Sequence, residues 1–112
     1  MVNPGIIETV KKYLLLIPDE LGMKKVYLFG SFAKCKEKEE SDIDVAIILN
    51  NMPDFFSTQQ QLMRLRRKVD LRIEPHPIRE KDFNKMNPFA YEIQQTGIEI
   101  KFDTKSGSDN AG

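Results

Sequence analysis

Apolar residues recur at helical spacing in several parts of the chain. Near the start they follow one another at three- and four-residue intervals from Ile6 to Ile17, which is typical of an amphipathic helix with one buried face. Asn3-Pro4 precedes this run as an N-cap residue followed by proline at the first helical position, and Asn87-Pro88 repeats that signature. The predicted helices span residues 4–17, 54–68, 79–86 and 88–95, with a short one at 31–34.

Strands are predicted where β-branched and aromatic residues cluster between these helices. Residues 25–29 end at Gly30, and residues 42–49 alternate at first and then become wholly apolar. A continuous apolar run indicates a central strand covered on both faces. We further expect strands at residues 69–74, closed by Pro75-His76-Pro77, and at 98–102, where apolar and charged residues alternate. The pattern α-β-α-β-α-β-α-β predicts the α/β class, with one small mixed sheet flanked by helices.

Composition narrows the functional classes without choosing one. The 112 residues include 17 Lys and Arg and 17 Asp and Glu, so the formal net charge is zero and no overall attraction to nucleic acid or membranes is expected. The single cysteine excludes an internal disulfide. No apolar run approaches the ~20 residues of a membrane span. We expect one domain over residues 1–103, a disordered tail over 104–112, and a cytoplasmic location.

The first candidate chemistry is a pair of aspartates. Asp42 and Asp44 are two residues apart in a predicted strand, so both side chains project from one face, about 6.6 Å apart along the chain. Two carboxylates at this spacing repel each other unless a cation lies between them. Asp44 also interrupts an apolar strand, where an uncompensated charge is costly. Oxygen ligands of this kind suit Mg²⁺, which shares its remaining positions with phosphates.

A second candidate lies at the end of the preceding strand. Gly30 allows a sharp turn and a close approach by a ligand, and Ser31 supplies a hydroxyl for a phosphate oxygen. A strand, turn and short helix would add free N–H groups for an anion. Taken alone, a Gly-Ser turn or an Asp-x-Asp strand start is usually only structural. Their combination predicts a nucleoside-triphosphate site.

Gly30-Ser31, ten intervening residues and then Asp42-x-Asp44 resemble the signature of the DNA polymerase beta nucleotidyltransferase superfamily. The chain looks most like its minimal nucleotidyltransferases, the antitoxin-type partners of HEPN-domain proteins, over roughly residues 6–102. The resemblance implies a sheet flanked by helices, two Mg²⁺ ions, and transfer of a nucleoside monophosphate from a triphosphate to a hydroxyl. In the antitoxin members, AMP is transferred to a tyrosine of the HEPN toxin.

The resemblance also assigns roles to further residues and shows where this chain departs from the family pattern. Lys34 stands where the family often has arginine, and we retain it with Gly30 and Ser31 in the phosphate-binding set. Cys35 replaces a glycine, so a turn that needs positive φ would be strained there. The family uses a third carboxylate as metal ligand and possible base; Asp70 is favoured for it. Glu74 is its rival, with a salt bridge to Arg72 as its structural alternative.

Several other residues are interpreted as structural. His76 reads as a surface residue in a rigid turn, although it could face a substrate base, and Phe89 and Tyr91 read as core residues. One local basic cluster is interpreted mainly as a solvated helix face. Its members are Arg64, Arg66, Arg67, Lys68 and Arg72.

We therefore expect a Mg²⁺-dependent nucleotidyltransferase that moves AMP from ATP onto an acceptor hydroxyl. Asp42, Asp44 and Asp70 would bind the two ions, and Asp70 would assist deprotonation of the acceptor. The expected acceptor is a tyrosine of a HEPN-type toxin, with no membrane partner and no nucleic acid as direct substrate. The alternative is a catalytically weak or inactive module that neutralises a partner by binding alone, an idea motivated by Lys34 and Cys35.

Overall fold

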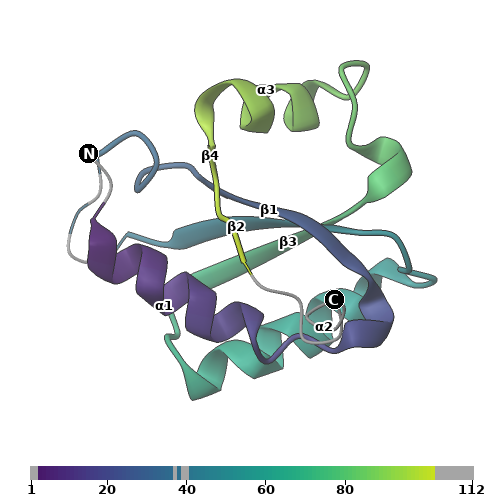
Figure 1. Cartoon of the computed structure of the whole chain (residues 1–112), viewed down its shortest axis with the longest axis horizontal. Coiled ribbons are helices and arrows are strands. Elements are labelled where there is room, and N and C mark those ends of the chain that lie inside the picture. Colours follow the sequence, from purple (N-terminus) through teal and green to yellow (C-terminus); the bar gives the residue numbers. More distant parts are fainter. Residues whose placement is uncertain (1–2, 37, 39–40, 103–112) are drawn as a thin grey trace, which may run out of the picture.

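The sheet at the centre of the molecule has four strands in the order β3-β2-β1-β4 (Figure 1). In this computed structural model, which describes residues 3–36, 38 and 41–102, β1 pairs antiparallel with β2 and β4, and β2 pairs parallel with β3. The expected small mixed sheet is therefore confirmed. The strands are β1 (Met23–Phe29), β2 (Ile43–Leu49), β3 (Ile73–Arg79) and β4 (Ile98–Glu99).

Three α-helices connect and cover these strands. Asn3 and Asn87 act as N-caps: the Asn3 side chain accepts from the Gly5 N–H at 2.7 Å, and the Asn87 side chain accepts from the Phe89 N–H at 3.0 Å. These side chains satisfy N–H groups that a helix start leaves without partners. The helices are α1 (Pro4–Leu14), α2 (Phe55–Leu65) and α3 (Pro88–Thr96). Short 3-10 helices occupy Asp19–Leu21, Arg66–Lys68 and Glu80–Asp82.

Both faces of β2 are buried, as its apolar run predicted. Alternate residues from Ile43 to Leu49 pack into the larger core with α1 and α2, while Ala46 and Ile48 face a smaller core that includes Ile93 of α3. Figure 1 shows α3 on one side of the sheet and α1 and α2 on the other. Asp44 shares the α3 side because successive strand residues point to opposite faces. The smaller core leaves part of that side open.

The third strand differs from its prediction. It begins at Ile73 rather than Val69 and continues through Pro75 and Pro77, which were expected to close it. The Ile43 N–H donates to the Arg72 carbonyl at 2.8 Å, so residues of even number in β3 turn their backbone groups toward β2 and the odd-numbered ones turn outward. Both prolines therefore lie at positions where a missing N–H breaks no ladder bond, as expected for an edge strand.

Three further expectations were wrong. Residues 31–34 form a hydrogen-bonded turn rather than a helix, and the region 79–86 contains only a 3-10 helix. Phe89 and Tyr91 are each 45% exposed and are not core residues.

Among the described residues, no helix has the length and apolar character needed to cross a membrane. The predicted tail, 104–112, and its boundary lie outside the described residues.

Candidate active site

Two carboxylates lie side by side on the open part of the α3 face. The strand register places Asp44 of β2 between Phe29 of β1 and Glu74 of β3. Since neighbours in register share a face of the sheet, these three side chains form one row across three strands. Asp44 and Glu74 keep 27% and 35% of their side chains exposed. Both carboxylates are thus available to a ligand above the sheet.

The turn after β1 closes against this row. Gly30 has φ +77°, and a Cβ built on it would lie 2.5 Å from Oδ2 of Asp44. No other residue type fits there without moving the carboxylate. The turn is held by the Lys34 N–H, which donates to the Gly30 carbonyl at 3.1 Å, and by the Lys36 N–H, which donates to the Ser31 carbonyl at 2.9 Å. The predicted approach of the Gly-Ser turn to Asp44 is present.

Cys35 completes this turn in a left-handed conformation. Its φ of +57° is the only positive value among the described non-glycine residues. A side chain in this region costs about 1–2 kcal/mol, because its Cβ crowds the following carbonyl. The strained turn expected at Cys35 is therefore confirmed by its positive φ.

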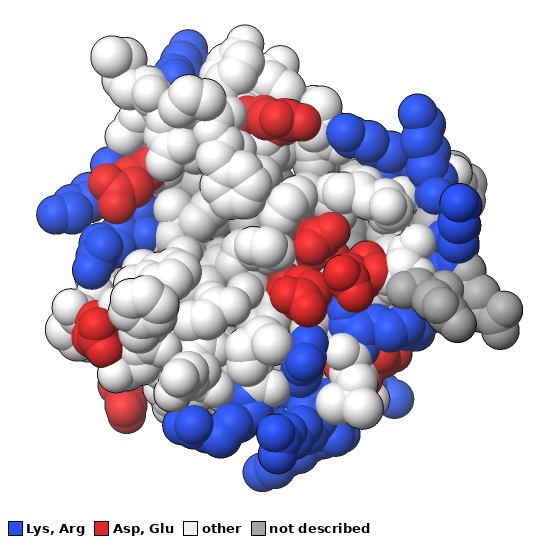
Figure 2. Space-filling view, turned by 180° about the vertical axis from the view of Figure 1, so that it is seen from behind, with Lys and Arg blue, Asp and Glu red and all other residues white. Residues whose placement is uncertain are grey.

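Asp42 lies immediately before β2 and is exposed. If the chain is extended at this point, its two-residue spacing from Asp44 puts both side chains on the same side. Figure 2 shows a compact group of acidic side chains near the middle of that view, bordered on one side by Lys and Arg side chains. Negative charge concentrated in this way favours a bound cation.

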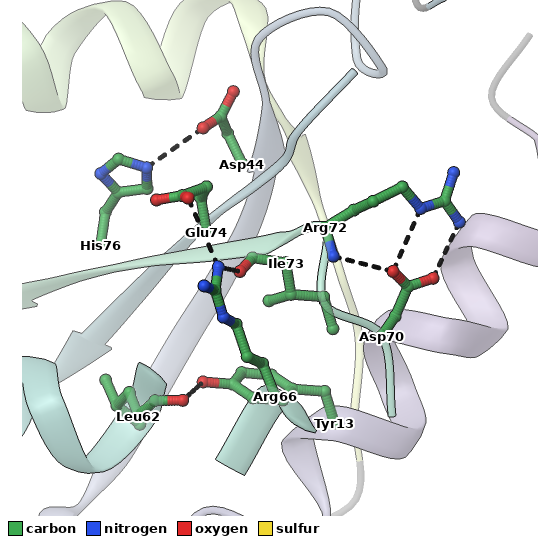
Figure 3. A network of polar contacts seen from close by, with 9 residues as sticks. All are labelled: Tyr13, Asp44, Leu62, Arg66, Asp70, Arg72, Ile73, Glu74 and His76. Carbon is green, nitrogen blue, oxygen red and sulfur yellow. Dashed lines mark hydrogen bonds and ion pairs between the residues drawn. The ribbon is translucent and has the colours of Figure 1, made fainter. Parts of the chain in front are cut away.

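Glu74 is held by a basic side chain from the end of α2. Nη1 of Arg66 donates to the Ile73 carbonyl at 2.9 Å and lies 3.4 Å from Oε2 of Glu74. The structural alternative considered for Glu74, a salt bridge to Arg72, gives way to this pair with Arg66 (Figure 3). Arg66 therefore offsets part of the charge of Glu74.

Asp70 lies apart from this group. It sits in the turn before β3, where its carboxylate accepts from Nη2 of Arg72 at 2.8 Å, from Nε at 3.1 Å and from the Arg72 backbone N–H at 2.9 Å. These hydrogen bonds lower the pKa of Asp70, and the same pairing raises the pKa of Arg72. Figure 3 shows the pair directed away from Asp44 and Glu74. The structure does not bring the favoured third carboxylate to the other two.

His76 belongs to the site, which sequence reasoning missed. It follows Glu74 by two residues in β3 and so projects from the same face, with Nε2 3.2 Å from Oδ1 of Asp44 (Figure 3). Its ring meets that of Phe29 edge-on, with centroids 5.1 Å apart. The two-residue spacing from Glu74 was the available signal, and treating Pro75-His76-Pro77 as a turn concealed it.

Lys34 points toward α3 rather than over the Gly30 turn. Its Nζ lies 4.0 Å from Oε2 of Glu92, and both side chains are largely exposed, so the pair is weak and free to rearrange. Gly30, Lys34 and Glu92 line a small cavity of about 100 Å³ together with Phe29 and residues of α3. An open space therefore adjoins the turn.

The donor set fits a hard cation that is completed by a ligand. Within the described part of the chain, no three His, Cys, Asp or Glu side chains converge into a ready-made metal site. Asp42, Asp44 and Glu74 nevertheless offer carboxylate oxygens, the donors that Mg²⁺ takes in small number beside substrate phosphates and water. Oδ2 of Asp44 lies against the Gly30 turn, and the small cavity lined by Gly30 and Lys34 adjoins that turn. The residues present fit Mg²⁺ bound together with a phosphate.

Comparisons with known proteins agree with this chemistry. A family model described as polymerase beta, nucleotidyltransferase matches residues 8–105. The chain is 31% identical over 101 residues to "Putative protein adenylyltransferase MJ0141" of Methanocaldococcus jannaschii, covering 85% of this chain and 98% of that protein. A crystal structure of a toxin-antitoxin with AMP-PNP superposes with a TM-score of 0.61 at 18% identity, covering 91% of this chain and 77% of the other. A crystal structure of a mutant of the toxin-antitoxin MntA-HpeT superposes with a TM-score of 0.59 at 16% identity, covering 91% of this chain and 77% of the other.

Proposed function

This chain belongs to the polymerase beta nucleotidyltransferase family, and from that premise we propose that it transfers AMP from ATP to a hydroxyl of a partner protein. The observation that carries the proposal is the contact of Asp44 Oδ2 with the Gly30 turn, next to Glu74 in register. It brings metal-binding oxygens to a turn that adjoins the small cavity lined by Gly30 and Lys34. The reaction would require both.

The phosphates would lie over the turn that begins at Gly30 and Ser31. The small cavity lined by Gly30 and Lys34 adjoins this turn, and the Ser31 hydroxyl can donate to a phosphate oxygen. Lys34 would leave its long contact with Glu92 and turn toward the triphosphate, because an exposed pair of this kind holds its partners weakly. Asp42 and Asp44 would hold Mg²⁺, which when bound neutralises phosphate charge.

We assign the third carboxylate to Glu74 rather than to Asp70. Glu74 is the register neighbour of Asp44, whereas both oxygens of Asp70 are engaged by Arg72. Recruiting Asp70 would break a two-pronged ion pair and require the turn before β3 to move. Glu74 needs only a small adjustment of its 3.4 Å contact with Arg66.

The transfer itself is an in-line displacement. The acceptor oxygen attacks the α-phosphorus, the bond from that phosphorus to the bridging oxygen breaks, and pyrophosphate leaves. The hydroxyl proton passes to the third carboxylate. Positioning and charge neutralisation supply most of the rate in reactions of this kind.

The proposed acceptor is a tyrosine of a HEPN-type toxin, which would make the chain an antitoxin. Support comes from two sources: a relative named as a protein adenylyltransferase, and toxin-antitoxin crystal structures that share the fold, one with AMP-PNP. The cofactor is Mg²⁺, in the two-ion form that the resemblance implies.

The test uses purified protein, a candidate HEPN-type toxin, Mg²⁺, and ATP labelled on either the α- or the γ-phosphate. We expect the α-label on the toxin, release of pyrophosphate, and an increase in the intact mass of the toxin by one AMP group. Labelling from γ-phosphate, or none under conditions where the toxin is neutralised, would contradict the proposal.

Two pairs of variants sharpen this experiment. The double variant Asp42→Asn, Asp44→Asn should abolish labelling; if it still neutralises the toxin with no gain in mass, the protein acts by binding alone. Glu74→Gln should lower the labelling rate by about 100-fold or more, while Asp70→Asn, the matched control, should change it little. The reverse result would return the third carboxylate to Asp70.

A further inference from the structure

We propose that His76 is a positioning residue that fixes the rotation of the Asp44 carboxylate, so that one oxygen faces the Gly30 turn and the other faces the imidazole. The effect of His76 on catalysis rests on the proposed function, whereas the orientation of the Asp44 carboxylate by His76 does not.

The two oxygens of Asp44 have different neighbours. Oδ1 lies 3.2 Å from Nε2 of His76, and Oδ2 lies against Gly30, 2.5 Å from where a Cβ would be. An ionised carboxylate only accepts hydrogen bonds, so Nε2 carries a hydrogen and donates it. A carboxylate held at one oxygen cannot rotate freely about its last bond. The second oxygen is thereby kept over the turn where phosphate would bind.

The imidazole is itself held in place. Its ring packs edge-on against Phe29 at 5.1 Å between centroids and lies 6.2 Å from the ring of Phe89. Phe29 and Phe89 contact each other at 5.6 Å. In sequence, His76 lies between Pro75 and Pro77, which are buried and whose rings fix φ. A rigid backbone and an aromatic wall therefore limit where Nε2 can point.

Such support matters because a ligating side chain binds better when it is already oriented. Residues that hydrogen-bond a metal ligand from behind typically contribute 10- to 100-fold to metal affinity or activity. Arg66 plays the corresponding part for Glu74, with Nη1 3.4 Å from Oε2. The two carboxylates in register are thus each held by one cationic or hydrogen-bond-donating neighbour.

The test compares His76→Phe with His76→Gln. Phenylalanine keeps an aromatic ring against Phe29 but donates no hydrogen bond, whereas the glutamine amide can donate to Oδ1 of Asp44. The first measurement is the amide resonance of Gly30 in the metal-free protein. The second is Mg²⁺ affinity from a titration followed by NMR. The third is the division of any activity loss between kcat and KM for ATP.

We expect His76→Phe to shift the Gly30 resonance and weaken Mg²⁺ binding by about 10-fold or more, with kcat falling more than KM changes. His76→Gln should stay within a few-fold of wild type, and circular dichroism should show both variants folded. Equal behaviour of the two variants, whether both like wild type or both impaired, would overturn the proposal.

Failure of the proposed function would look different. If the wild-type protein transfers no nucleotide, the assignment as an adenylyltransferase fails. The metal-free comparison at Gly30 would still decide whether His76 orients Asp44, because that measurement needs neither nucleotide nor acceptor.

Discussion

Replacing Gly30 by alanine perturbs the contact on which the candidate site depends. The residue has φ +77°, and the added methyl group would lie 2.5 Å from Oδ2 of Asp44 and 3.3 Å from its Cγ. Both the backbone and the carboxylate must respond. The variant therefore tests local conformation and site geometry at once, and the two effects can be separated.

The stability cost follows from the backbone. A left-handed conformation costs a residue with a Cβ about 1–2 kcal/mol, and the reduced freedom of alanine in the unfolded chain returns about 0.4–1 kcal/mol. Relief of the clash adds a further loss, so a total of about 1–2 kcal/mol is expected. A domain with a typical stability of at least about 5 kcal/mol stays almost fully folded after this loss.

The activity cost follows from the carboxylate. To reach a normal contact distance, Asp44 Oδ2 must retreat by roughly 1 Å, a displacement that typically lowers an enzyme's rate by about 100-fold. We therefore expect Gly30→Ala to reduce AMP transfer, measured with α-labelled ATP, by about that factor. Its unfolding midpoint in urea should fall modestly.

Gly22→Ala is the matched control. Gly22 also has positive φ, +65°, and its Cβ would collide with the side chain of Asn50, at the other end of the β1–β2 pair. We expect a similar or larger loss of stability and unchanged transfer per folded molecule. If Gly30→Ala transfers AMP as well as the control does, the reasoning about the turn and Asp44 is refuted.

Three smaller changes test other parts of the structure. Tyr13→Phe removes the hydroxyl that donates to the buried Leu62 carbonyl at 2.6 Å, and should lower the free energy of unfolding in urea by about 1–2 kcal/mol; no change would contradict this contact. Cys35→Gly relieves the strain at φ +57° and should raise the free energy of unfolding by about 0.5 kcal/mol, which corresponds to a melting temperature a few degrees higher. A lower melting temperature would exclude strain at this position. Hydrogen bonds from Arg72 lower the pKa of Asp70. The pair therefore stabilises the fold fully at pH values above the unfolded-state pKa of Asp70, about 3.9, and this stabilisation is lost as the pH falls through the lower folded-state pKa. Asp70→Asn should therefore cost about 0.5–1 kcal/mol at pH 7, and parallel urea titrations at lower pH should show the difference from wild type shrinking.

The fold class and the central contact of the site were predictable because they depend on local patterns. The apolar run after Asp44 predicted a strand buried on both faces, and both cores are present. Glycine at position 30 predicted a sharp turn, and its φ is positive. Strain at Cys35 was expected for a different reason, because the family resemblance implies a glycine at that position, and its φ is also positive. Each of these inferences uses the steric limits of one residue or the alternation of one strand.

The third carboxylate could not be chosen from sequence because Asp70 and Glu74 differ by an even number of positions. Both would project from the same face of a continuous strand, so alternation does not separate them. What separates them is the start of β3 at Ile73, which depends on pairing with β2, a segment distant in sequence. His76 was missed for a related reason: proline ends a central strand but is tolerated at an edge, and edge position is a property of the whole sheet.

The two prolines of β3 also affect what can attach to the sheet. At the outer side of this strand the Ile73 carbonyl is already engaged by Arg66, and Pro75 and Pro77 offer no N–H there. An incoming extended peptide, or a second molecule aligned edge to edge, would find too few N–H donors to form a regular ladder. Protection from amyloid-like growth at this border thus comes from the same segment that carries His76 toward Asp44.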